Sequence, residues 1–295
     1  GFELNVADVT AIAAGDIALD STANQLEKVT LANISGNIAV GSGNKQNNNY
    51  LTVITNGEIK GDLRIANYND GSGFVNNIAF ADDLQATGAI TILSQEASIN
   101  VNDQANIVGR AVTLTAAKNV LMQGGTVKAA VADLEAEENV QLNGGKIIAS
   151  EVTLQAGNDV AWRGGTVQAM NVTLDADGSI VLTSGTLDAQ TAKLKLHATN
   201  NDAAGNIMEA DGFALLAEDL TAQTAAAGER IGLDSRKNEL ANVAVSNVEG
   251  QVTIGSGNAH TSKALTLTTG SDVVKGALSI TNYNDGSGSL NEIKV

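Results

Sequence analysis

Apolar residues return every 20 positions in the middle of the chain, between Ala111 and Lys195. Three columns of this repeat stay apolar through four or five successive copies: Leu114, Leu134, Leu154, Leu174 and Leu194; Val120, Val140, Val160 and Ile180; Val127, Ile147, Val167 and Leu187. A fixed period of this length is typical of a solenoid, in which one repeat buries its apolar face by stacking on its neighbours.

Within each repeat the apolar positions lie two residues apart, as in the pairs Val112 with Leu114, Val120 with Met122, and Val127 with Ala129. Alternation with period 2 predicts β-strands, whereas an apolar stripe of helical period is absent. Polar or glycine-rich corners separate the three segments. The pattern therefore predicts an all-β fold, a right-handed parallel β-helix with three short strands in each coil of about 20 residues.

The corners of the predicted coil carry residues that suit sharp turns. One column reads Gly124, Gly144, Gly164 and Ser184, and the next reads Gly125, Gly145, Gly165 and Gly185. Glycine accepts the positive φ angles that such bends often need. Another corner presents Asn119, Asn139, Asp159 and Ser179, which predicts a ladder of side chains hydrogen-bonded to the turn backbone.

A longer repeat relates the two ends of the chain. The segment GFELNVADVTA from Gly1 returns as GFALLAEDLTA from Gly212, and NYNDGSG begins at both Asn67 and Asn282. We interpret the chain as a section of a longer tandem protein and expect residues 1–295 to form one continuous β-helical rod. Its expected divisions are a long unit at 1–211, made of less regular coils (1–87), regular coils (88–197) and a connecting coil (198–211), followed by the start of the next unit at 212–295.

Composition narrows the function classes. The net charge of −16 argues against a basic face for nucleic acid, and no apolar run is long enough for membrane insertion. The chain has no cysteine, which excludes disulfides and thiolate metal sites. Its lack of proline fits segments that need their strand N–H groups.

Residue types that carry chemistry are scattered. His197 and His260, the two histidines of the chain, lack the spacing of a metal-binding or catalytic pair. The outward positions beside the leucine column hold carboxylates at Asp133, Glu135 and Asp175, of which the first two approach each other along one strand. We therefore predict no catalytic, cofactor-binding or metal-ligating residues.

Three features could still bind a ligand. Trp162 occupies the column of Met122, Leu142 and Leu182, which predicts interior packing rather than sugar binding. Asp70 and Asp285 lie in the NYNDGSG copies, where a turn is favoured over a cation site, although calcium is the one cofactor left open. A weakly polar outward strip is a candidate contact surface: Leu121, Gln141, Ala161 and Val181, with Ile148 on another strand.

The segment from Ala217 to Gly257, and the coils that begin at Val152 and Val172, resemble repeats of filamentous haemagglutinin-like exoproteins, which are secreted by the two-partner route. The resemblance implies an extracellular rod, secreted or on the bacterial surface, whose partners are a host-cell, matrix or glycan ligand, a neighbouring bacterial surface, and adjacent repeat units of its own chain. We therefore expect a non-enzymatic spacer with a multivalent adhesion surface. Two alternatives are a β-helix polysaccharide lyase or hydrolase and a passive spacer without a ligand.

Overall fold

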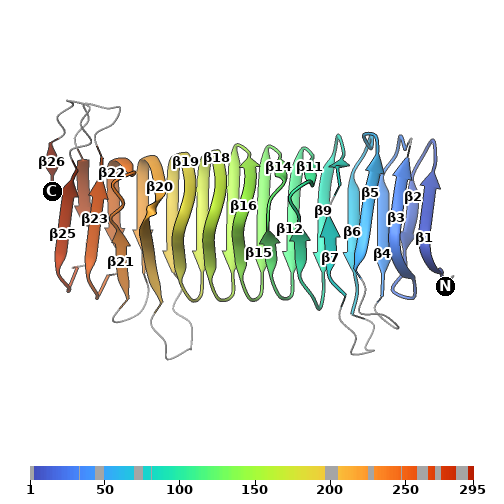
Figure 1. The fold of residues 1–295 in the computed structure, drawn as a ribbon, viewed down its shortest axis with the longest axis horizontal. Helices are drawn as coiled ribbons and strands as arrows, with labels where there is room; N and C mark the ends of the chain where they lie inside the picture. The colour runs from blue at the N-terminus through green and yellow to red at the C-terminus, as the bar shows by residue number, and fades with distance from the viewer. Residues whose placement is uncertain are drawn as a thin grey trace. The chain divides into compact units, whose positions relative to one another are not determined.

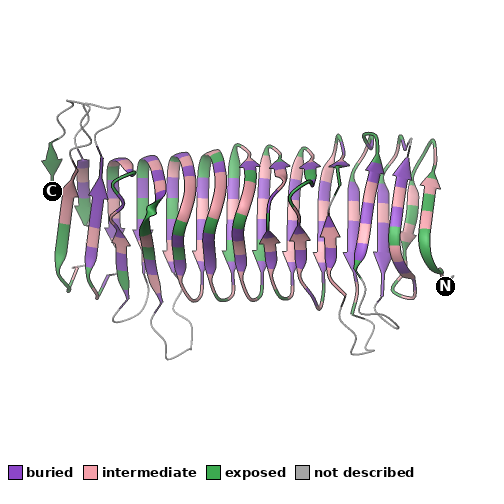
Figure 2. Cartoon of the chain, in the orientation of Figure 1, coloured by how far each residue is buried: buried purple, intermediate pink, exposed green. Residues whose placement is uncertain are grey.

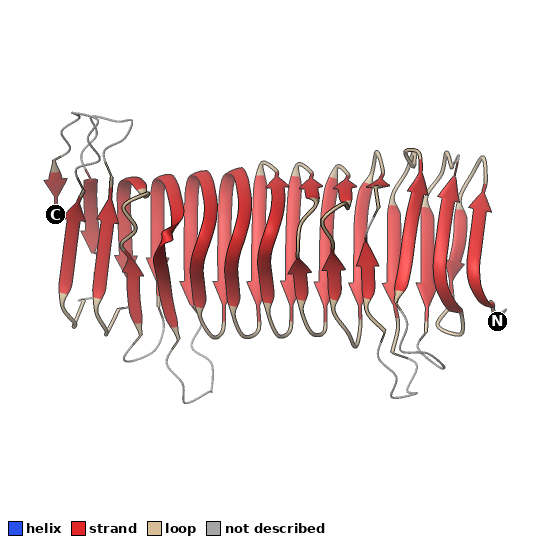
Figure 3. Cartoon of the chain, viewed as in Figure 1, coloured by secondary structure: helices blue, strands red, loops and turns tan. Residues whose placement is uncertain are grey.

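The computed structural model describes residues 3–295 except 33, 44–49, 70–75, 81, 197–204, 225–228, 247, 258–264, 270–273 and 284–291. Every regular element in these residues is a β-strand, and every strand pairing is parallel (Figure 3). The predicted parallel β-helix is therefore confirmed. The chain forms two compact units, 1–150 and 151–295, and the expected division at residue 211 stays a prediction.

Unit 1 stacks its strands in three series (Figure 1). The first series is β2 (Ile17–Asp20), β4 (Ile38–Ser42), β6 (Leu63–Asn67), β9 (Ala89–Ser94), β12 (Ala111–Ala116) and β15 (Val131–Ala136). The second is β1 (Asn5–Ile12), β3 (Gln25–Ala32), β5 (Leu51–Asn56), β7 (Ile78–Phe80), β10 (Ile99–Val101), β13 (Val120–Met122) and the start of β16 (Val140–Ile148). The third is β8 (Leu84–Gln85), β11 (Asn106–Val108), β14 (Thr126–Lys128) and the end of β16.

Unit 2 begins with β17 (Glu151–Ala156), which pairs with the end of β18 (Val160–Ala176). Strand β18, β19 (Ile180–Leu196) and β20 (Asn206–Gln223) then pair along most of their lengths. Two series continue from β20, namely β21 (Arg230–Leu233), β23 (Val252–Ser256) and β25 (Leu278–Asn282), and β22 (Glu239–Ser246), β24 (Leu265–Thr269) and β26 (Ile293–Lys294).

The strand register confirms the 20-residue repeat inside each unit. In unit 1, Leu114 pairs with Leu134, and in unit 2, Leu174 pairs with Leu194. Three strands per coil occur from β6 to β14, whereas the earlier coils alternate one short strand with one long strand, such as β2 with β3. Buried and more exposed residues alternate along the strands, so the apolar columns line the interior of each unit (Figure 2).

Polar side chains at the corners link each coil to the next. In unit 1, Asn119 Oδ1 accepts a hydrogen bond from Asn139 N at 3.2 Å, and in unit 2, Asp159 Oδ1 accepts one from Ser179 N at 2.7 Å. The predicted corner ladder is therefore confirmed. Unit 1 contains a second ladder, in which the acceptors Asp16, Asn37 and Asp62 bind the main-chain N–H groups of Asn37, Asp62 and Ala89 at 2.7, 2.9 and 2.8 Å.

The second glycine column is required by the backbone. Gly125, Gly145, Gly165 and Gly185 have φ angles of 70, 81, 85 and 113°, as the corner pattern predicted. A Cβ atom at Gly145 would also collide with the carbonyl oxygen of Gly124 in the preceding coil. Gly124 and Gly144 lack positive φ, so the backbone conformation of this column does not itself require glycine, and the equivalent position 184 holds a serine.

Candidate functional site

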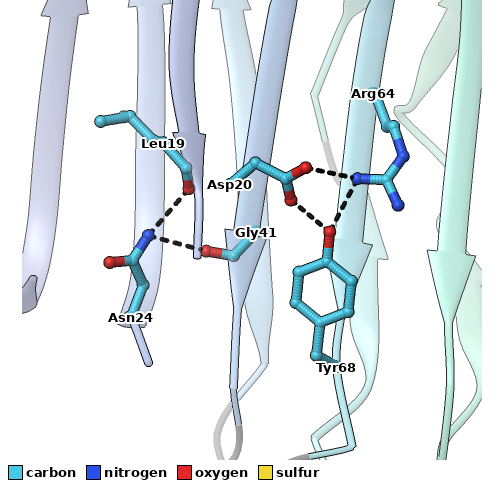
Figure 4. A network of polar contacts seen from close by, with 6 residues as sticks. All are labelled: Leu19, Asp20, Asn24, Gly41, Arg64 and Tyr68. Atoms are coloured by element: carbon cyan, nitrogen blue, oxygen red, sulfur yellow. Dashed lines mark hydrogen bonds and ion pairs between the residues drawn. The ribbon is translucent and has the colours of Figure 1, made fainter. Parts of the chain in front are cut away.

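The two copies of the long repeat build the same buried polar cluster, once in each unit. In unit 1, Asn24 Nδ2 donates hydrogen bonds to the carbonyl oxygens of Leu19 and Gly41 at 2.8 and 3.2 Å (Figure 4). Its Oδ1 accepts a hydrogen bond from Leu4 N at 3.1 Å. Asn24 is 2% exposed and thus joins three coils from inside a corner.

In unit 2, two of these three contacts recur around Asn238. Its Nδ2 donates to the carbonyl oxygen of Gly255 at 3.3 Å, and its Oδ1 accepts from Leu215 N at 3.0 Å. A buried serine completes both copies. Ser42 Oγ accepts from Leu26 N and Ser256 Oγ accepts from Leu240 N, each at 2.9 Å. The sequence repeat is therefore also a repeat of local structure.

A tyrosine follows the last strand of each cluster and lies over a glycine. Tyr68 Oη donates a hydrogen bond to Asp20 Oδ1 (Figure 4), and a Cβ atom at Gly41 would lie only 2.6 Å from Tyr68 Cε2. In the second copy, Tyr283 Oη donates to Asp234 Oδ1 at 2.6 Å. Gly41 is needed because any side chain there would displace the ring.

An arginine lies over each tyrosine ring, but the two arginines come from different positions. The Arg64 guanidinium is 5.7 Å from the centre of the Tyr68 ring, and that of Arg236 is 5.4 Å from the Tyr283 ring. Arg64 also donates from Nη1 to Asp20 Oδ2 at 2.8 Å and to Tyr68 Oη at 2.7 Å. Alignment of the copies places serine 279 opposite Arg64. The cluster thus retains the cation, although Arg64 comes from strand β6 and Arg236 from the turn between β21 and β22.

The chemistry of this cluster is that of an anchor. Burial and the hydrogen bond to Asp20 raise the pKa of Tyr68, and the hydrogen bond to Asp234 and burial raise the pKa of Tyr283. Both phenols therefore stay protonated at neutral pH and are poor bases. Tyr68 and Tyr283 hold the start of the NYNDGSG copies against the coil that contains the aspartate. Asp70 and Asp285 lie outside the described residues, as do His197 and His260.

A second polar group lies in an interior column of unit 2. Strand pairing places Glu209 beside Leu182, which itself pairs with Trp162, so the column changes from apolar to acidic at β20. Glu209 Oε2 accepts hydrogen bonds from Asn238 Nδ2 at 2.7 Å and from Ser235 N at 3.0 Å, whereas its buried Oε1 has no hydrogen-bond partner.

The electrostatics of Glu209 follow from this position. Burial raises its pKa to about 7, the two hydrogen bonds to Oε2 oppose that shift, and the nearby charges of Asp234 and Asp211 add to it. Sequence reasoning missed Glu209 because the chain between β19 and β20 is longer than a regular connection. Aligning NIMEADG from Asn206 with SIVLTSG from Ser179 would have placed Glu209 in the interior column.

Trp162 lies where its column predicted, inside unit 2. Its side chain is 0% exposed, and its ring meets Phe213 edge-on with centroids 5.1 Å apart. The indole Nε1 is buried without a hydrogen-bond partner. Interior packing, rather than an exposed sugar platform, is therefore confirmed for this tryptophan.

The outward carboxylates lie beside different kinds of neighbour. Asp133 and Glu135 pair with Thr113 and Thr115 on β12, and Lys195 Nζ lies 3.9 Å from Asp175 Oδ2 in unit 2. Among the residues that the structure describes, no group of three or more His, Cys, Asp or Glu side chains could hold a metal ion.

Two surface features of unit 2 remain as candidate contact sites. Val181 pairs with both Ala161 and Met208, and Val181 and Met208 are 38% and 51% exposed, whereas Ala161 is buried. The predicted weakly polar strip is therefore exposed at Val181 and continues onto β20 at Met208, but it does not include Ala161. An open groove is lined by the carboxylates Asp188, Glu218 and Glu239 and the apolar residues Ala189, Leu216, Ala217, Leu240 and Ala241.

Comparison of the chain with protein-family models, curated proteins and solved structures finds no match. The described part of the chain contains no helix that is long and apolar enough to cross a membrane. What the chain does is therefore argued from its geometry.

Proposed function

We propose that this chain is a structural and adhesive segment of a large secreted or cell-surface bacterial exoprotein, with filamentous haemagglutinin-like character. The observation that carries the proposal is the duplicated cluster of Asn24 and Asn238, which rebuilds one local structure in two units. What is duplicated is a buried structural cluster rather than a reactive centre. This supports a protein that grows in length by tandem duplication of a structural unit. Such a chain serves as a spacer and presents the same outer surface many times.

The strands support a mechanical role. Parallel pairing with coil-to-coil ladders gives each coil main-chain and side-chain contacts to the next, and these contacts continue through each unit. Repeated weak contacts along the outer faces would add through avidity, because binding of one unit raises the effective concentration of the next. The partners of such a surface are host-cell, matrix or glycan ligands, or a neighbouring bacterium.

The exposed strip of Val181 and Met208 is the described surface best suited to contact. We also expect the segments 44–50 and 258–263 to vary between copies of the long repeat; of these residues the structure describes Tyr50, which is 51% exposed. The groove with Asp188, Glu218 and Glu239 is the observation that favours the enzymatic alternative, because β-helices can use carboxylates on an outer face for sugar cleavage. Its lining contains no aromatic residue on which a sugar ring would stack.

A binding array separates these functions. The purified chain is applied to glycans and extracellular-matrix proteins, with and without calcium, and sugar cleavage is scored in the same wells. Binding without cleavage supports adhesion, and its loss in a Val181→Ser, Met208→Ser variant assigns it to the strip. Cleavage that disappears in Glu239→Gln would overturn the proposal in favour of a hydrolase or lyase. Neither binding nor cleavage would reduce the role to a passive spacer.

A further inference from the structure

The largely buried carboxyl group of Glu209 has a cost that binding a proton lowers. An ionised carboxylate offers about four acceptor sites, and burying a charged acceptor without partners is more unfavourable than burying a neutral one. Both hydrogen bonds to Glu209 go to Oε2, and the buried Oε1 accepts none. A proton on Oε1 removes the charge and leaves both bonds to Oε2 in place.

The surrounding charges act in the same direction. Asp211 on β20 and Asp234 in the segment after β21 both repel an ionised Glu209. The nearby cations are engaged elsewhere, since Lys237 Nζ donates to the carbonyl oxygen of Gly212 at 3.2 Å and Arg236 lies over the Tyr283 ring. Among the described residues, the structure records no ion pair that involves Glu209.

The segment that binds Glu209 also holds the second copy of the repeated cluster. Ser235 Oγ donates to the carbonyl oxygen of Phe213 at 2.7 Å, and Asn238 contacts Leu215 and Gly255 as described above. In the first copy, Asn24 Nδ2 donates to the carbonyl oxygen of Leu19. In the second copy, Asn238 Nδ2 donates to the titratable side chain of Glu209.

We propose that Glu209 is a proton-controlled latch, which as a neutral acid holds the turn 235–238 on β20 and as a carboxylate loosens that turn. The pKa of about 7 in the fold lies above that of an exposed glutamate. The stabilising contribution is therefore complete below the exposed value of 4.5 and is lost as pH rises to about 7, because over this range the native state binds a proton that the unfolded state has released. The second cluster is accordingly firmer in mildly acidic surroundings than in mildly alkaline ones.

Hydrogen exchange on the full chain tests the latch. Peptides that cover 230–240 are followed between pH 6 and 8.5 in the parent and in Glu209→Gln, and the ratio of their rates at each pH cancels the intrinsic pH dependence of exchange. We expect the ratio to rise by up to tenfold per pH unit below about pH 7, where the closed turn keeps a proton on Glu209 that the opened turn has released, and to level off above about pH 7.5. Glu218→Gln, which removes a charge from an outward position of the same strand, serves as the matched control and should behave as the parent does. A ratio that stays constant from pH 6 to 8.5 would overturn the proposal.

A second measurement is independent of whether Glu209→Gln folds. Carboxyl carbons of the glutamates are labelled, and their chemical shifts are followed by NMR during a pH titration. We expect one glutamate of the parent to titrate near neutrality, and its midpoint to fall in Asp211→Asn, which removes a neighbouring negative charge. The latch is wrong if every glutamate titrates in the range of an exposed carboxyl group.

Discussion

Replacing Trp162 by alanine removes the largest side chain from the interior of unit 2. The ring is fully buried and packs edge-on against Phe213 at 5.1 Å. Truncations of this kind are unfavourable by about 3 to 5 kcal/mol, which includes the loss of an aromatic pair. The indole Nε1 is buried without an acceptor, so its removal also relieves a penalty, and we expect the net loss to fall at the lower end, near 3 kcal/mol.

Urea unfolding followed by far-ultraviolet circular dichroism measures this loss without relying on the deleted fluorophore. The slope of the transition must stay the same as in the parent for the midpoint to report stability. Trp162→Phe is the first control, because it keeps an aromatic partner for Phe213 and removes the unpartnered N–H group. It should lose less than about 1.5 kcal/mol. Val181→Ala, at a position 38% exposed on the neighbouring strand, should change stability by less than about 0.5 kcal/mol.

Because coils contact their neighbours alone, the damage should be local. Hydrogen exchange in Trp162→Ala should accelerate in β18, β19 and the part of β20 around Phe213, while β12 in unit 1 keeps its protection. Equal unfolding midpoints for Trp162→Ala and the parent would refute the reasoning. So would a loss as large for Val181→Ala as for Trp162→Ala.

Four further predictions follow from the corners and the clusters. Gly57→Ala should lower the free energy of unfolding in urea by about 1 to 2 kcal/mol, because Gly57 has positive φ. Gly145→Ala should lower it by more, because Gly145 has positive φ and its new Cβ atom would also collide with a backbone oxygen. Equal losses in the two variants would show that the collision has no effect on stability. Tyr68→Phe should lose about 1 kcal/mol of stability by removing the hydrogen bond to Asp20, with Tyr50→Phe as an exposed control that leaves the unfolding midpoint unchanged. Ultraviolet titration should show two tyrosines ionising above the usual pKa of 10, and their contribution to stability, present below pH 10, should be lost as pH rises through the raised pKa; two ordinary midpoints would contradict this. Between pH 4.5 and 8, the free energy of unfolding of the parent should fall by about 3 kcal/mol more than that of Glu209→Gln, because only the parent has this raised pKa. Parallel pH profiles of the two proteins would refute that magnitude.

The sequence predicted those parts of the fold in which one column repeats at fixed spacing. The leucines at 114 and 134, the glycines with positive φ and the corner acceptor Asn119 all belong to such columns, and the structure places them as expected. A periodic coil makes this possible because each position has the same neighbour one period away. The side chain at one position therefore reports the environment of the whole column.

The candidate sites were harder to predict because their contacts join residues that are not separated by the regular 20-residue period. Tyr68 bonds to Asp20, 48 residues earlier, across a coil of irregular length. Arg64 and Arg236 fill the same role from different positions, so comparison of the two sequence copies conceals the cation. Glu209 lies 27 residues after its partner Leu182 rather than 20, which breaks the alignment of its column. The prediction of one continuous rod and the adhesive role remain predictions.

The corner ladder of Asp16, Asn37 and Asp62 in unit 1 keeps the same hydrogen bond from coil to coil, although the coils differ in length. Its successive acceptors and donors are 21, 25 and 27 residues apart, yet every step closes the same kind of hydrogen bond. The additional residues of the longer steps fall between strands, for instance between Ser42 and Leu51. The ladder therefore counts coils rather than residues. A peptide inserted into such a connection should leave the pairing of the interior columns unchanged. These connections are therefore suitable places to alter what the chain displays without altering the strands that support it.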